Sequence, residues 1–119
     1  MGHRAARLES QIKDELSLIV LHKMQDSAFG LVTITGVKLS PDLKIAKVYI
    51  SVYEKSNRPV VLEKFEASRG MIRTELAHKI RVRFVPDLKF FIDDTQDYVE
   101  KIDSLLKQIH ESDNQRERE

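Results

Sequence analysis

The sequence predicts an α+β protein built as a two-layer sandwich, with helices covering one face of a three-stranded mixed sheet. Three observations indicate this: amphipathic helical periodicity near both ends of the chain, two adjacent stretches typical of strands, and a helical crossover before a third strand. The expected order is helix, strand, strand, helix, helix, strand, helix, which gives two packed layers. A chain of 119 residues suits one domain.

The first half predicts a helix followed by a hairpin. Residues 4–25 carry apolar side chains at spacings of three and four, which indicates an amphipathic helix. Residues 31–39 and 45–53 predict two antiparallel strands, with Gly36 permitting a bulge in the first. The second strand alternates: Ala46, Val48, Ile50 and Val52 face one way, and Lys47, Tyr49, Ser51 and Tyr53 face the other. Only one face of this sheet is therefore expected to be covered.

The second half predicts a crossover, a third strand and a final helix. Short helices are expected over residues 60–68 and 71–81, with Gly70 as a helix stop or kink between them. Residues 88–92 predict the third strand, and residues 96–110 the last helix, which Asp93, Asp94 and Thr95 would cap. The domain is expected to span residues 1–111, followed by a disordered charged tail over residues 112–119.

Composition excludes several classes of function. The chain has no Cys, so disulfides, thiolate metal sites and a Cys nucleophile are excluded. It shows no signal-peptide core and no membrane-spanning run, so a cytoplasmic protein without membrane contact is expected. No catalytic or nucleotide-binding motif is present, and the four His residues lack ligand spacing. A protein that is not an enzyme and has neither metal nor cofactor is therefore expected.

Charge is distributed unevenly along the chain. Residues 1–92 hold 16 Lys/Arg and 10 Asp/Glu, a net of +6, whereas residues 93–119 hold 4 and 9, a net of −5. The segment from Arg69 to Lys89 is the most basic, with only Glu75 and Asp87 as acids. The overall asymmetry is compatible with nucleic-acid binding and equally with an ordinary solvated surface, whereas the basic segment from Arg69 to Lys89 slightly favours a phosphate-binding track.

Aromatic residues on the predicted polar strand face raise a second possibility. Tyr49 and Tyr53 lie beside Lys47, and aromatic side chains on a sheet can stack on RNA bases. The surrounding composition lacks a recognisable RNA-binding run. Solvent-side strand residues are therefore the favoured interpretation.

Six stretches, taken in order and spacing, carry a family resemblance. They are Arg4–Leu8 with Asp14-Glu15-Leu16, Leu31–Val37, Ser40–Ser51, Gly70–Leu76 and Ile80–Phe90. Over residues 4–106 the chain resembles bacterial ribosome-binding factor A. The resemblance implies a type-II KH-like domain, in which an Ala-x-Gly kink replaces the GxxG loop of other KH domains. Here the matching register is Ser68-Arg69-Gly70, with Ala67 one residue earlier.

The resemblance also implies a function. Members of this family bind the free small (30S) ribosomal subunit, assist late maturation of its 16S rRNA without catalysis, and are associated with growth in the cold. Their release is linked to ribosome-assembly GTPases. The expected RNA-binding residues, from the basic segment and nearby cations, are Arg69, Gly70, Arg73, Lys79, Arg81 and Arg83, with Lys38, Lys44, Lys47, Arg4 and Arg7.

Two alternatives to ribosome assembly stay open from the sequence. One is a KH-type RNA binder acting elsewhere. The other is a protein-interaction module acting through the acidic last helix, which bears Glu100, Asp103 and Glu111. A monomer is expected, since the sequence shows no large exposed apolar patch.

Overall fold

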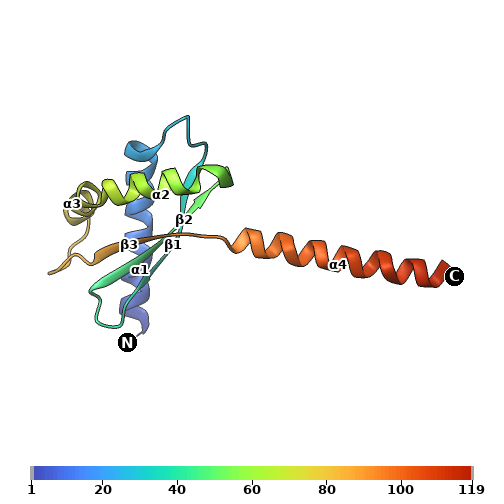
Figure 1. Ribbon diagram of the computed structural model, residues 1–119. Coiled ribbons are helices and arrows are strands. Elements are labelled where there is room, and N and C mark those ends of the chain that lie inside the picture. The colour runs from blue at the N-terminus through green and yellow to red at the C-terminus, as the bar shows by residue number, and fades with distance from the viewer. Residues whose placement is uncertain (1, 119) are drawn as a thin grey trace.

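The computed structural model describes the backbone of residues 2–118 and the side chains of residues 3–112. Its elements are α1 (Gly2–Ile19) with a π-helical last turn (Val20–Met24), β1 (Val32–Leu39), β2 (Ile45–Val52), a short 3₁₀ turn (Lys55–Asn57), α2 (Arg58–Ala67), α3 (Arg69–Lys79), β3 (Asp87–Ile92) and α4 (Thr95–Arg118). The sheet order is β1-β2-β3, antiparallel then parallel. The predicted α+β class and mixed three-stranded sheet are confirmed (Figure 1).

The hairpin follows its predicted pattern. Ala46, Val48, Ile50 and Val52 of β2 are all buried, because alternate residues of a strand point to the same face. The pairing register shifts between Ile34 and Gly36, so the predicted bulge is present. The shift restores Leu39 to the buried face.

The core lies between the sheet and the helices α1, α2 and α3. Its fully buried members include Ile12 and Leu16 of α1, Phe65 of α2, and Ile72 and Leu76 of α3. These helical residues pack with the inward-facing residues of all three strands in one cluster. The opposite face of the sheet carries no helix (Figure 1).

The break between α2 and α3 falls at Ser68, two residues before Gly70 and within the predicted kink of Ala67, Ser68 and Gly70. Ser68 has φ −95° and ψ 4°, and its N–H donates to the carbonyl oxygens of Lys64 and Phe65. The prediction that Gly70 stops the helix is wrong, because Gly70 is the second residue of α3 and its φ is not positive. The bridge conformation that Ser68 adopts is open to any residue, so the kink needs no glycine. A Cβ at position 70 would meet no heavy atom within 4 Å, so the backbone at Gly70 is open to solvent.

The last helix projects away from the body instead of covering the sheet (Figure 1). The radius of gyration is 18.9 Å, against about 13.5 Å for a compact chain of this length. The first turn of α4 is held to the body by Asp97, which accepts hydrogen bonds from the Arg58 guanidinium at 2.7 and 3.1 Å. Lys55 approaches Asp97 and Glu100 at 3.1 and 3.2 Å.

The expected helix end near residue 110 is wrong, because α4 continues to Arg118. Its backbone therefore runs through residues 112–118, for which composition predicts a disordered tail. The Glu, Gln and Arg residues of this stretch favour helix when packing makes no demand, and this accounts for the extension. The side chains beyond Ser112 fall outside the described residues.

Candidate nucleic-acid interface

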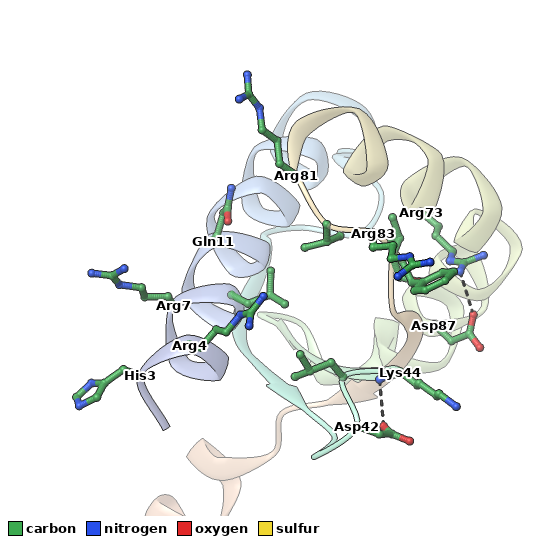
Figure 2. Close-up of a pocket in the computed structure, with 15 residues that line it drawn as sticks. His3, Arg4, Arg7, Gln11, Asp42, Lys44, Arg73, Arg81, Arg83 and Asp87 are labelled. Carbon is green, nitrogen blue, oxygen red and sulfur yellow. Dashed lines mark hydrogen bonds and ion pairs between the residues drawn. The ribbon is translucent and has the colours of Figure 1, made fainter. Parts of the chain in front are cut away.

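A broad hollow of about 1250 Å³ lies between the start of α1, the β1–β2 turn and the α3–β3 loop. Leu8, Leu43, Val82 and Val85 line it, and all four also pack against the core. Six Arg and Lys side chains surround these apolar residues: Arg4, Arg7, Lys44, Arg73, Arg81 and Arg83. We call this hollow and its six cations the basic groove (Figure 2).

Four separate segments supply the cations. Arg4 and Arg7 come from the first turns of α1, and Lys44 from the hairpin turn. Arg73 comes from α3, and Arg81 and Arg83 from the loop that follows. Figure 2 shows Arg4 directed into the hollow and Arg7 and Arg81 directed outward from it. The fold thus gathers on one surface cations that are up to 79 residues apart in the sequence.

The groove keeps a net positive charge. Two carboxylates, Asp42 and Asp87, also line it, leaving a net of +4 with His3 neutral. Asp42 accepts hydrogen bonds from the Ser40 hydroxyl and the Lys44 backbone N–H, and these contacts lower the pKa of its carboxyl. Asp42 is therefore ionised at neutral pH and orders the turn that carries Lys44.

Arg73 has a structural contact besides its place in the groove. Its Nη2 donates to the backbone carbonyl of Val85 at 2.8 Å and lies 3.5 Å from Asp87. These contacts tie α3 to the loop that leads into β3. Replacing Arg73 would therefore disturb the loop as well as remove a charge.

Phe84 is a feature of the groove that the sequence reasoning missed. Its side chain is 76% exposed, and the Arg83 guanidinium lies 5.5 Å from its ring centroid. Exposed aromatic rings beside guanidinium groups can stack on unpaired bases. The only sequence signal would have been an aromatic residue inside the most basic stretch.

The structure separates the other expected RNA-binding residues from the groove. Arg69 pairs with Glu66 and lies 5.9 Å from the ring centroid of Phe90. Lys79 and Gly70 lie on exposed positions of α3 that do not line the groove. Lys38 and Lys47 lie on the uncovered face of the sheet, since their neighbours Leu39 and Val48 point into the core. Six of the eleven expected residues thus come together, and five do not.

Within the described part of the chain, no cluster of three or more potential metal ligands occurs. The described helices also include none with the length and apolarity needed to cross a membrane.

Comparisons with known proteins agree with this architecture. The family model of ribosome-binding factor A matches residues 4–106. A ribosome-binding factor A of Thermodesulfovibrio yellowstonii is 41% identical over 106 residues, covering 89% of this chain and 90% of that protein. One of Desulfatibacillum aliphaticivorans is 39% identical, covering 98% and 95%.

Solved structures give the same result. The crystal structure of ribosome-binding factor A from Thermus thermophilus superposes with a TM-score of 0.66 at 26% identity, covering 74% of this chain and 94% of that one. A model of the Thermus thermophilus protein, fitted into an electron cryo-microscopy map of a 30S–RbfA complex, superposes with a TM-score of 0.63 at 26% identity. It covers 73% of this chain and 92% of that one. With a family model matched across its globular body and relatives near 40% identity over most of its length, this chain belongs to the ribosome-binding factor A family.

Proposed function

We propose that this protein binds the free small ribosomal subunit through the basic groove and assists late maturation of 16S rRNA without catalysing a reaction. One observation carries the proposal: six cations from four segments surround a single groove. The Thermus thermophilus relative fitted into the map of a 30S–RbfA complex supports the choice of partner.

The chemistry of the groove suits a folded RNA better than a small ligand. Its cations are spread around an open surface, so they can each contact a different phosphate of the backbone. Arg7 and Arg81 point outward, where they can reach phosphates beyond the groove itself (Figure 2). The apolar lining and the exposed Phe84 ring can receive a base that is not paired. Binding of this kind positions RNA and requires no bond to be made or broken.

The same proposal includes the cellular setting. A factor of this kind acts in the cytoplasm, where subunits mature, is needed most during growth in the cold, and leaves the subunit with the help of an assembly GTPase. A monomer is also part of the proposal, although the expected absence of an exposed apolar patch is wrong for α4, whose apolar side chains are exposed. Sedimentation equilibrium tests the oligomeric state directly.

Co-sedimentation with purified small subunits, large subunits and whole ribosomes tests the proposal. We expect binding to free small subunits alone, weakening steeply as salt rises. Equal binding to all three particles would indicate a general RNA binder acting outside ribosome assembly. Binding to none of them would contradict the proposal.

A second candidate function is a protein contact through α4. Six apolar side chains of this helix are between 44% and 61% exposed: Tyr98, Val99, Ile102, Leu105, Leu106 and Ile109. They recur at spacings of three and four, as in helices that pack against a partner. If α4 serves only protein contacts, the combined substitution of Ile102 and Ile109 by Ser leaves the affinity for naked 16S rRNA unchanged. A loss of RNA affinity in that variant would contradict this second function.

A further inference from the structure

Three lysines form one row across the uncovered face of the sheet. Lys38 of β1 pairs in register with Lys47 of β2, and Lys47 pairs in register with Lys89 of β3. Residues paired across strands point to the same face, and all three lysines are exposed. Neighbouring strands lie about 4.8 Å apart, so the row extends about 10 Å across the sheet.

This row is unfavourable for the isolated fold, because like charges directly opposite each other destabilise a sheet. No ion pair joins any of the three lysines to a carboxylate among the described side chains. Asp87, two residues before Lys89, approaches Arg73. Asp93, at the other end of β3, accepts hydrogen bonds from the hydroxyls of Thr35 and Thr95. Neither carboxylate therefore neutralises the lysine row. An anionic partner bound to the row would relieve the repulsion among the three lysines.

A pair of aromatic rings lies in the next row on the same face. Tyr49 of β2 pairs in register with Phe91 of β3, with ring centroids 5.8 Å apart and ring planes 30° from parallel. Phe91 is 41% exposed. On the other side Tyr49 pairs with Gly36, which has no side chain to stand beside the tyrosine ring. Tyr49 is half-buried and Phe91 is exposed, so the two rings present a partly open aromatic surface about 7 Å along the strands from the lysine row.

The sequence alone favoured solvent-side strand residues at Tyr49, because it could not show what lies beside that ring. The parallel register of β3 supplies both a second ring and a third lysine. The five side chains Lys38, Lys47, Lys89, Tyr49 and Phe91 together form what we call the sheet platform.

We infer that the sheet platform binds single-stranded RNA, with bases stacked on Tyr49 and Phe91 and phosphates held by the lysine row. Proteins that bind single strands combine a positive track with aromatic rings in this way. Its lysines and rings belong to the uncovered face of the sheet, and none of the five lines the basic groove. The inference rests on the proposed function for its RNA partner, and the platform adds a site for an unpaired segment beside the one proposed in the groove.

Fluorescence titration with a 12-nucleotide oligouridine tests the inference, with a 12-base-pair RNA duplex as the comparison. The double variant Tyr49→Leu, Phe91→Leu keeps apolar strand residues while removing both rings. Loss of one stacked base weakens binding about 5- to 150-fold, so we expect this variant, which lacks both rings, to bind oligouridine at least about 5-fold more weakly. Lys47→Gln should weaken binding about fivefold at about 0.1 M salt. Ser51→Ala, on the same face of β2, is the matched control and should bind as the parent does.

A second readout reports stacking directly. The chain has three Tyr and no Trp, so a change in tyrosine emission is not masked by tryptophan. Oligouridine should quench this emission in the parent protein, and Tyr49→Leu should remove most of the quenching. A Tyr49→Phe variant should retain the affinity, because phenylalanine keeps the ring.

Several results would overturn the inference. One is unchanged oligouridine affinity in the double leucine variant. Another is equal affinity for oligouridine and polyglutamate, which would indicate a general anion surface. A third is loss of oligouridine binding only when Arg7 and Arg81 of the groove are replaced. Since the platform is tested with a free oligonucleotide, its failure is distinguishable from a failure to bind small subunits.

Discussion

Removing two outer cations of the basic groove gives a quantitative test of the proposed RNA contact. Arg7 and Arg81 are exposed and point away from the body, and no hydrogen bond or ion pair holds either one among the described residues (Figure 2). The double variant Arg7→Ala, Arg81→Ala should therefore keep the free energy of unfolding within about 0.5 kcal/mol of the parent. Any loss of binding then reflects the missing charges.

The size of the loss follows from counterion release. Each phosphate contact contributes a slope of about −0.7 in log K against log salt for single strands, so one contact is worth about fivefold at about 0.1 M salt. Two contacts predict binding about 25-fold weaker at about 0.1 M, but only about threefold weaker at about 0.5 M. The slope itself should become shallower by about 1.4.

Sedimentation of labelled protein with small subunits, at fixed magnesium and several salt concentrations, measures both quantities. The control variant Lys101→Ala, Lys107→Ala removes the same charge from exposed positions of α4 and should bind as the parent does. A deficit that is the same at all salt concentrations would refute the electrostatic reasoning. An equal deficit in the control would show that net charge, and not the groove, governs binding.

Three further perturbations test the fold. Gly70→Ala should raise the free energy of unfolding by about 0.5 kcal/mol, because Gly70 is helical and a Cβ there would meet open space. A variant that is less stable than the parent in chemical denaturation would contradict the helical conformation of Gly70. Ile72→Ala should lower that free energy by about 2–5 kcal/mol, since Ile72 is fully buried, whereas Met71→Ala at the exposed neighbouring position should cost much less. Arg58 and Lys55 lower the pKa of Asp97 from 3.8 to about 2, so its contribution to stability is present above about pH 4 and is lost as the pH falls toward 2. The difference in melting temperature between the parent and Asp97→Asn should therefore shrink over that interval, and a difference that stays constant down to pH 2 would contradict the ion pair.

The strands could be predicted because the signal for them is local. Alternation along β2 determines which residues enter the core, and Gly36 marks the bulge in β1. The kink was predicted within Ala67, Ser68 and Gly70, and the break does lie at Ser68. Only the assignment of the helix stop to Gly70 was wrong, because the conformation of Ser68 leaves no mark in composition.

The groove and the sheet platform depend on tertiary topology, which composition does not encode. The basic run identified Arg73, Arg81 and Arg83, but only the fold brings Arg4 from the first helix beside them. Similarly, strand alternation predicted that Lys47 lies on the outward face. Its alignment with Lys38 and Lys89 depends on the register between strands, which the sequence does not show. The apolar periodicity of α4 predicted an ordinary amphipathic helix, and nothing in it distinguishes a covered face from a bare one.

Because α4 contacts the body only near its start among the described residues, a small rotation there produces a large displacement at its far end. It has 24 residues and a length of about 36 Å, so a rotation of only about 10° at its base moves its tip by about 6 Å. The contacts that set its angle are concentrated at Asp97 and Glu100, within the first two turns. A small rearrangement around Arg58 would thus be amplified into a displacement at Arg118 larger than the diameter of a water molecule, and a pair of spectroscopic labels on the body and near the tip would register it.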